Sequence, residues 1–346
     1  MKIIHSADIH LGAPINSFPK QVSDERKREV RNTFLRMVDF ARQQGVAVIM
    51  LSGDVFDRDK PYKKDVDFFY GVVEKNPDID FLYLRGNHDQ EGEARDIPNL
   101  KTFSSAWQSY TYGDVVISGI ELLPENASSL YSTLSLDAKK KNVVMLHGQV
   151  AGDINLVKLR DKNIDYLALG HIHEYSDGEI DGRGRYAYSG CLEGRGFDET
   201  GKKGFILLDT SDKLSYTFLP FSVRSIERIE LDVSGLEEGG AMARLARKEI
   251  SFQKENIYRI ELVGEVDADV DDFTEDVERY LQGDCAYLSV KNKTKKKIDY
   301  TAYDGDNSLK GEFVRTVRES TEYTEEEKAQ IIAFGLKALA GREVDA

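Results

Sequence analysis

Five short motifs in the first half of the chain contain five of its six histidines. Each motif follows a short apolar run, and four of them contain glycine, which indicates strand ends that open into tight loops. Imidazoles, carboxylates and one carboxamide form a ligand set for a pair of divalent transition metals. Such a pair is what the hydrolysis of a phosphate ester needs. The motifs are Asp8-Ile9-His10, Gly53-Asp54, Gly86-Asn87-His88-Asp89, His147-Gly148 and Gly170-His171-Ile172-His173.

The spacing of the ligands suggests how they would share two cations. Asp8 and His10 are two positions apart, so on an extended backbone they project to the same side and can hold one ion. Asp54 follows the buried apolar run 46–51, and its best role is a bridging ligand with one oxygen to each metal. Asn87 offers an amide oxygen, which Mn²⁺ accepts but structural zinc rarely uses.

The histidines divide into ligands and one catalytic residue. His88 lies beside Asn87 and cannot easily point to the same ion, so we assign it to the phosphate, as a donor to the transition state or the departing oxygen. Asp89 would fix the tautomer of the His88 ring. His88 and Asp89 are therefore the predicted catalytic residues. The predicted metal ligands are Asp8, His10, Asp54, Asn87, His147, His171 and His173.

Several neighbouring residues keep two interpretations. His5 lies within the first expected strand, where a hydrogen-bonded structural histidine is favoured over a ligand. Asp57 could touch the site or cap the loop that follows. Arg85 could hold phosphate or lie on the surface at a strand end. The stretch 190–197, which includes Arg195, could face the substrate or form an ordinary connection between sheet strands.

Composition limits the class of protein. The chain has 346 residues, 40% of them hydrophobic and 31% charged, as in an ordinary globular protein. Cys191 and Cys285 form no metal-binding pattern and are interpreted as buried thiols in a reducing compartment. The N-terminus has no signal-peptide pattern and no apolar stretch could span a bilayer, so we expect a cytoplasmic protein with no membrane association.

Charge argues against an extended nucleic-acid surface. The formal net charge is −14, whereas most nucleic-acid binders have a basic face. Two features soften the objection, because bound cations offset acidic ligands and because five lysines gather between positions 291 and 297. For those lysines a solvated linker is the favoured interpretation.

Hydrophobic periodicity and composition predict four segments. Residues 1–221 alternate strands and helices before a β-rich end, which indicates an α/β fold: a layered sandwich of two mixed sheets flanked by helices. Residues 222–292 have a β-α-β-α-β pattern and predict a small α+β cap domain. A lysine-rich linker, 293–307, follows. Residues 308–346 carry two helical patterns, the second preceded by the capping box of Thr324 and Glu327.

In their order and spacing, the five motifs resemble the calcineurin-like metallophosphoesterase superfamily. Within it, the opening Ile4-His5-Ser6-Ala7-Asp8-Ile9-His10-Leu11-Gly12 is similar to the start of the SbcD-type DNA exonucleases. So is the stretch 196–204, GFDETGKKG, which general phosphatases do not share. The resemblance covers residues 1–220 by motif and the remainder by architecture.

This resemblance implies a function and a division of the ligands. It implies a DNA exo- or endonuclease for DNA repair, with two Mn²⁺ ions, a DNA-capping domain and C-terminal helices that bind a coiled-coil ATPase of the SbcC type. One metal site would use Asp8, His10, Asp54 and His173, and the other Asp54, Asn87, His147 and His171. The transition-state residue would be His88.

The chain departs from the family in two places. Relatives form homodimers through helices between the third and fourth motifs, but only 58 residues, 89–146, lie there. Some relatives have a histidine where this chain has Asp57.

Two other functions remain as alternatives: a phosphoesterase for small phosphodiesters or phosphomonoesters, and a nuclease-like scaffold that regulates an ATPase. The intact ligand set argues against the scaffold.

Overall fold

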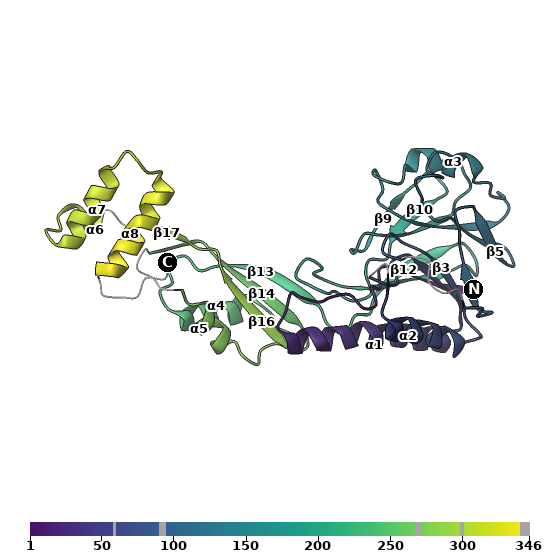
Figure 1. Ribbon diagram of the computed structural model, residues 1–346, viewed down its shortest axis with the longest axis horizontal. Helices are drawn as coiled ribbons and strands as arrows, with labels where there is room; N and C mark the ends of the chain where they lie inside the picture. Colours follow the sequence, from purple (N-terminus) through teal and green to yellow (C-terminus); the bar gives the residue numbers. More distant parts are fainter. Residues whose placement is uncertain (58–59, 90–94, 268–271, 298–300, 340–346) are drawn as a thin grey trace. The chain divides into compact units, whose positions relative to one another are not determined.

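The computed structural model describes residues 1–57, 60–89, 95–267, 272–297 and 301–339. The chain divides into two compact units, Met1–Ser225 and Ile226–Ala346 (Figure 1). The predicted domain 1–221 lies within the first unit, and all five motifs belong to it.

The first unit contains two mixed sheets, each of six strands within the described residues. The order of the first sheet is β12 (Ser215–Pro220), β11 (Gly204–Asp209), β1 (Lys2–Ser6), β2 (Val46–Ser52), β3 (Asp80–Leu84) and β4 (Leu100–Thr102). In this sheet the neighbouring strands from β1 to β4 are parallel, and β11 is antiparallel to β1. The order of the second is β5 (Gln108–Tyr112), β6 (Val115–Gly119), β7 (Lys141–His147), β8 (Tyr166–Gly170), β10 (Arg185–Tyr188) and β9 (Ser176–Glu179).

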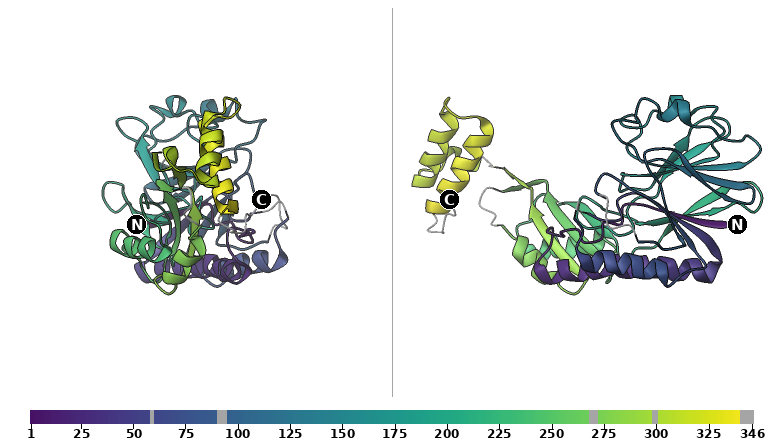
Figure 2. Two further views of the ribbon diagram at one scale, coloured as in Figure 1. Left: turned by 90° about the vertical axis from the view of Figure 1, so that its left-hand side faces the viewer. Right: turned by 45° about the vertical axis from the view of Figure 1, so that its right-hand side comes forward.

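Alternating side chains pack these sheets into layers. Ile3 and Val48 of the first sheet point into a core shared with the second sheet, whereas their neighbours Ile4 and Ile49 pack under the helices α1 (Lys20–Gln44) and α2 (Lys63–Glu74). Figure 2 shows α1 running along the unit. The outer face of the second sheet packs on α3 (Leu130–Thr133) and the 3₁₀ helix η1 (Leu156–Leu159). The predicted α/β sandwich of two mixed sheets is confirmed.

The strand directions determine where the motifs meet. The strands β1, β2 and β3 are parallel to one another, as are β6, β7 and β8. Loops that follow parallel strands leave at the same edge of a sheet, which is where open α/β sheets bind ligands. Each of the five motifs lies at the carboxyl end of β1, β2, β3, β7 or β8.

The second unit begins with a three-stranded parallel sheet among the described residues, in the order β13 (Ile226–Asp232), β14 (Ile257–Val263) and β16 (Tyr287–Asn292). The helix α4 (Gly239–Glu249) joins β13 to β14, and α5 (Thr274–Tyr280) lies between β14 and β16. Both helices pack on the sheet through one apolar cluster. The elements follow the predicted β-α-β-α-β order.

The segment predicted as a linker, 293–307, is more ordered than expected. It contains β17 (Lys295–Lys297), which pairs with β15 (Glu265–Asp267), and the helix α6 (Thr301–Asp304). Lys293 donates to Glu261 at 2.7 Å. Part of the predicted linker therefore forms regular structure, because acidic residues more than 30 positions earlier pair with Lys293 and Lys297, whose side chains stay 46% and 64% exposed. Residues 298–300 lie outside the described residues.

The chain continues into two longer helices, α7 (Leu309–Glu319) and α8 (Glu325–Leu339), which lie side by side. The predicted capping box is confirmed: the Thr324 backbone amide donates to Glu327 Oε2 at 2.8 Å, and the Glu327 amide donates to Thr324 Oγ1 at 3.3 Å. A small apolar cluster that includes Val314 and Ile332 holds the pair together.

Within the described residues, no helix combines the length and the apolar character that crossing a membrane would require.

Candidate metal centre

The two sheets bring all seven predicted ligands to one place. Asp8 and His10 follow β1, Asp54 follows β2, and Asn87 follows β3 on the first sheet. His147 is the last residue of β7, and His171 and His173 follow β8 on the second sheet. The site is therefore assembled across the interface between the sheets.

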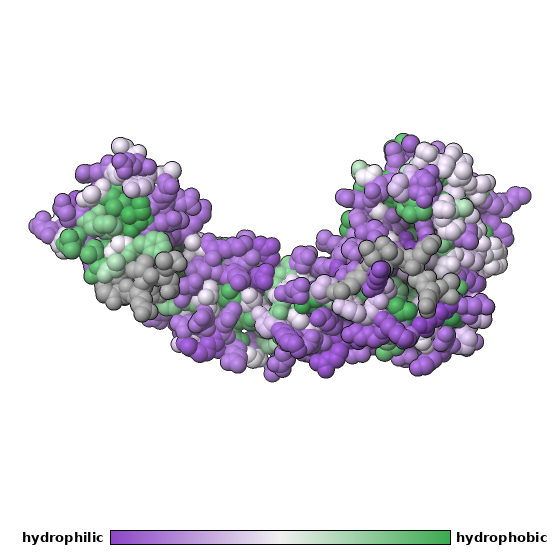
Figure 3. Space-filling view, viewed as in Figure 1, coloured by the Kyte–Doolittle hydropathy of each residue, from purple (hydrophilic) through white to green (hydrophobic). Residues whose placement is uncertain are grey.

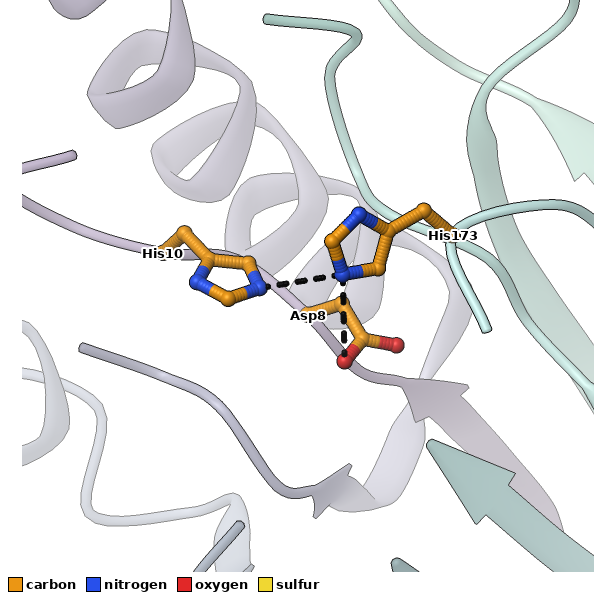
Figure 4. Close-up of side chains that lie close together, drawn as sticks. All are labelled: Asp8, His10 and His173. Atoms are coloured by element: carbon orange, nitrogen blue, oxygen red, sulfur yellow. Dashed lines mark hydrogen bonds and ion pairs between the residues drawn. The ribbon is translucent and has the colours of Figure 1, made fainter. Parts of the chain in front are cut away.

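The first group of ligands is Asp8, His10 and His173 (Figure 4), whose candidate ligand atoms all lie within 4.8 Å of one another. His10 Nε2 lies 3.2 Å from His173 Nε2, and His173 Nε2 lies 3.9 Å from Asp8 Oδ1. Asp8 and His10 are buried. This is a compact set of one carboxylate and two imidazoles.

The second group gathers around the Asn87 side chain. Its Oδ1 lies 2.9 Å from His147 Nε2 and 3.2 Å from His171 Nδ1. The amide oxygen thus lies between two imidazoles that come from the second sheet.

Asp54 connects the two groups through a single oxygen. Its Oδ2 lies 3.8 Å from His10 Nε2 and 3.4 Å from His147 Nε2. Its Oδ1 instead accepts a hydrogen bond from the His88 backbone amide at 2.9 Å. The expectation of one carboxylate oxygen for each metal is therefore corrected, because only Oδ2 faces both groups.

In His10, His147 and His173, a partner near Nδ1 leaves Nε2 for the centre. His147 Nδ1 lies 2.9 Å from the Ser52 carbonyl oxygen, so this nitrogen carries the proton and donates it. His173 Nδ1 lies 2.7 Å from Glu199 Oε1, and His10 Nδ1 lies 3.0 Å from Asp57 Oδ1. Hydrogen-bonded rings of this kind are the usual form of metal-ligating histidines.

The electrostatics of the site fit a cation. Burial raises the pKa of Asp8 to about 6 and lowers the pKa of His10 to about 4, since both lose solvent. Burial would also raise the pKa of Asp54, but His147 outweighs it and brings the value to about 2. Burial would lower the pKa of His147, yet Asp54 and Asp8 raise it to about 9. Oxygen and nitrogen donors around two buried carboxylates match divalent transition metals.

Backbone strain marks the same residues. The described residues include seven non-glycine positions with positive φ, and four of them are Asp8 (51°), His10 (51°), Asp54 (51°) and His171 (98°). Such conformations cost about 1–3 kcal/mol each and gather at functional sites. This is a structural sign of function that the sequence does not reveal.

Close approach explains two of the motif glycines. A Cβ added at Gly86 would collide with the side chain and backbone of Asp54, and one at Gly53 would collide with the His147 ring. Only glycine lets these loops approach the ligands so closely.

The predicted catalytic pair is only partly as expected. His88 is exposed at the site, with its ring centroid 5.2 Å from that of His10. Asp89 does not orient the His88 ring. The Asp89 carboxylate instead accepts hydrogen bonds from the backbone amides of Phe56 (2.8 Å), Gly86 (3.1 Å) and Val55 (3.2 Å). The expected tautomer role of Asp89 is therefore wrong. A local sequence pattern could not show this, because the amides of Val55 and Phe56 belong to another loop.

The residues with two interpretations are also placed. His5 is buried, with Nδ1 2.9 Å from the Tyr166 hydroxyl and Nε2 3.2 Å from the Leu169 carbonyl oxygen, which is a structural role. Asp57 touches the site through His10. Arg85 pairs with Glu121 at 2.6 and 2.7 Å.

Sequence reasoning missed Glu199. The stretch 196–204 was singled out by the family resemblance, but no residue in it was given a role. The Glu199 carboxylate contacts the predicted ligand His173, which lies 26 positions earlier in the sequence, and only the fold brings the two side chains together.

Two cavities open beside the ligands. One of about 730 Å³ is bordered by Asn87, His147 and His171 and has an apolar wall that includes Leu122 and Leu123. The other, of about 340 Å³, touches His10 and contains four basic residues: Lys27, Arg28, Arg31 and Lys64.

Comparisons with known proteins show which proteins this chain is similar to. Residues 1–175 match the calcineurin-like phosphoesterase family. The chain is 23% identical to the DNA double-strand break repair protein Mre11 of Sulfolobus acidocaldarius, over 96% of this chain and 94% of that protein. It is 30% identical to the uncharacterized metallophosphoesterase YhaO of Bacillus subtilis, over 63% of this chain and 60% of that protein. A dimetal phosphatase structure from Danio rerio is also similar, with 13% identity and a TM-score of 0.44 over 60% of this chain and 92% of that one.

The matched residues include all five motifs. The chain belongs to the calcineurin-like phosphoesterase family. It is a hydrolase that acts on phosphoester bonds, and its family uses divalent metal ions.

Proposed function

We propose that this protein is a manganese-dependent DNA nuclease of the SbcD type, which cleaves phosphodiester bonds during DNA repair. Relatives named as DNA double-strand break repair proteins align with 96% of the chain in one case and 76% in another, which supports DNA as the substrate class. The cap sheet and the C-terminal helices lie outside the residues matched to the family and give the chain more than a phosphatase needs.

The observation that carries the proposal is the shared oxygen of Asp54, which faces both ligand groups. Asp8, His10, Asp54 and His173 would hold one ion, and Asp54, Asn87, His147 and His171 the other. When bound, such a pair supplies an activated water and stabilises the charge that develops on the phosphate.

His88 would act on the phosphate. Its backbone amide is fixed to Asp54 Oδ1, while its ring is exposed beside His10. His88 Nδ1 lies 3.4 Å from the Asp57 carbonyl oxygen, which leaves Nε2 directed away from that loop. Because Nδ1 faces a carbonyl oxygen, which only accepts, the ring would donate from Nε2 to a phosphate oxygen or to the departing oxygen as an imidazolium.

The cavities beside the ligands have room for more than a phosphate group. The larger one combines the apolar side chains of Leu122, Leu123 and Pro124 with polar groups of the site. Apolar walls with a few polar groups are typical of pockets for small organic groups. We assign this cavity to the nucleoside next to the cleaved bond.

The remaining features of the proposal concern assembly. A coiled-coil ATPase of the SbcC type would bind the helices α7 and α8, and the three-stranded cap would contact DNA. The protein would work in the cytoplasm, as a homodimer if helices near residues 89–146 pair between copies. The formal charge of −14 makes the partner necessary for tight DNA binding.

The test uses the full chain with linear double-stranded DNA, single-stranded DNA and bis-nitrophenyl phosphate, each with Mn²⁺. Cleavage of DNA is expected, and His88→Ala should slow it by about 100-fold or more, as removal of a general acid does. Manganese content should stay at two ions in His88→Ala. Lys139→Ala, which changes an exposed side chain, is the matched control and should cleave like the wild type.

Hydrolysis of the small ester without any cleavage of DNA, even with a candidate ATPase present, would favour the small-phosphoester alternative. Absence of hydrolysis of every substrate would favour the scaffold. A His88→Ala variant as fast as the wild type would remove His88 from the reaction.

A further inference from the structure

The stretch between β10 and β11 carries a network that the proposed reaction does not yet use. Arg195 and Glu199 lie there, with only 15% and 7% of their side chains exposed. Both contact the first group of ligands and not the second. The sequence alone left Arg195 and Asp57 without a role.

Glu199 holds the His173 ring. Its Oε1 accepts from His173 Nδ1 at 2.7 Å, and its Oε2 accepts from the Arg195 backbone amide at 2.7 Å. Lys203 Nζ donates to the His173 carbonyl oxygen at 2.8 Å, so the residue is fixed at both its ring and its backbone.

Asp57 stands behind the His10 ring as an ion-pair partner. Its Oδ1 lies 3.0 Å from His10 Nδ1, and the two side chains are 16% and 2% exposed. Asp57 comes from the loop after β2, whereas Glu199 comes from the loop before β11.

Arg195 joins these two carboxylates. Its Nη1 donates to Asp57 Oδ1 at 3.2 Å, and its Nε donates to Glu199 Oε1 at 3.1 Å. Its Nη2 also lies 3.2 Å from His173 Nδ1. A guanidinium is suited to this task because its planar donors reach several acceptors at once. It neutralises two carboxylates that would otherwise repel each other.

We propose that Arg195, Asp57 and Glu199 form a positioning network for only one of the two metal sites, the one held by Asp8, His10, Asp54 and His173. This inference rests on the proposed metal pair. Carboxylates behind metal-ligating imidazoles fix the tautomer and raise the basicity of the ring, and losing such a partner costs about 10–100-fold in metal affinity. The second site is independent of the network, since the Ser52 carbonyl oxygen fixes His147.

The decisive experiment is Mn²⁺ titration of the full-length Arg195→Met variant, followed by calorimetry and by electron paramagnetic resonance. Methionine replaces the aliphatic stem of the arginine with an unbranched apolar side chain that has no charge and no donors. One ion is expected to bind about 10–100-fold more weakly while the other binds as in the wild type. Arg183→Met is the matched control, because Arg183 pairs with Asp165 away from the ligands and should leave both affinities unchanged.

A second variant tests the same network in case the Arg195→Met variant does not fold. Glu199→Gln keeps the shape of the side chain and removes the charge behind His173, so it should weaken the same ion. Hydrolysis by both variants should return toward the wild-type rate at high Mn²⁺, which a general loss of structure would not allow.

Equal weakening of both ions, or unchanged affinity in both variants, would overturn the network. A wild-type protein that binds fewer than two ions would instead overturn the metal pair itself, and with it the inference.

Discussion

At the scale of single residues, the most constrained position is Asp54. One of its oxygens is fixed by the His88 amide at 2.9 Å and the other faces two imidazoles. The residue also adopts a φ of 51°. A side chain held at both oxygens and strained in its backbone is difficult to replace, because even an isosteric substitute changes the charge that both groups share.

Asp54→Asn is therefore expected to weaken the binding of both ions and to reduce hydrolysis more than about 100-fold, since even outer partners of metal ligands cost 10–100-fold. Manganese content after gel filtration and hydrolysis of bis-nitrophenyl phosphate measure the two effects. An Asp54→Asn variant that retains two ions would contradict the shared role of this oxygen.

The two cysteines give a prediction about pH. Burial raises the pKa of Cys285 to about 11 and raises the pKa of Cys191 further. Only the thiolate reacts, so at pH 8 alkylation of Cys285 by iodoacetamide should be about 100-fold slower than in the unfolded chain, and it should accelerate as the pH rises. Mass spectrometry of the labelled protein gives both rates. Equal rates in folded and unfolded protein would contradict the buried placement.

At the scale of elements, α1 is tied to the rest of its unit by a buried acid. Glu193 accepts from Arg26 Nη2 at 2.8 Å and from Thr33 Oγ1 at 2.6 Å, both on α1, and from the Val223 backbone amide. Its side chain has no exposed surface. These contacts fix the loop that leads to Arg195 against the helix.

Glu193→Ala should destabilise the protein by about 1–3 kcal/mol, because it removes one partner of the buried Arg26, which keeps its ion pair with Glu29, and the acceptor of the buried Thr33 hydroxyl. Urea unfolding followed by circular dichroism measures the change. The control is Asp67→Ala, which breaks exposed ion pairs to Lys63 and Arg95 and should cost at most about 1 kcal/mol. Similar losses in the two variants would show that Glu193 is not a structural tie.

The helices α7 and α8 leave apolar side chains in solvent. Leu309 is 70% exposed and Phe334 is 49% exposed, and Figure 3 shows hydrophobic residues gathered on this part of the chain. The apolar side chains of α8 are therefore divided, with Ile332 in the cluster between the helices and Phe334 outside it. Exposed apolar surface of this kind marks interaction sites.

Phe334→Ser should abolish binding of an SbcC-like ATPase while leaving hydrolysis of small esters within about 2-fold of the wild type, since the side chain is far in sequence from the metal ligands and lies in the other unit. Co-purification with the ATPase measures the first effect. Glu326→Ser, which changes an exposed polar side chain of the same helix, is the control. Retained binding in Phe334→Ser would place the partner elsewhere.

At the scale of the whole molecule, the chemistry belongs to one unit. All seven predicted ligands, the positioning residues and both cavities beside the site lie within Met1–Ser225. That unit has its own apolar cores between and outside the two sheets. The second unit contributes its own sheet and helices, with separate cores.

A chain shortened to residues 1–225 should consequently keep Mn²⁺-dependent hydrolysis of bis-nitrophenyl phosphate within about 10-fold of the full chain and lose most DNA cleavage, because the groups proposed to hold DNA and the ATPase are removed. The ratio of the two activities is the measurement. DNA cleavage at the full-chain rate would show that the second unit is not needed for the substrate.

Much of this architecture was predictable because its signals are local. Alternating and helical patterns of apolar residues predicted the two mixed sheets and their helices, and Thr324 with Glu327 predicted the start of α8. The partners of Lys293 and Lys297 were not predictable, since Glu261 and Glu265 lie on strands that are distant in sequence.

The sequence by itself determined which residue types meet, because five motifs at the ends of parallel strands can only gather at the edge that those strands share. Only the tertiary structure decided how they meet. It gave Asp54 Oδ2 to both ligand groups and assigned Asp89 to backbone amides. It also placed Arg195 and Glu199 behind the imidazoles. The physical reason is that hydrogen bonds and ion pairs between distant segments depend on distances of a few ångströms, which composition and spacing along the chain do not specify.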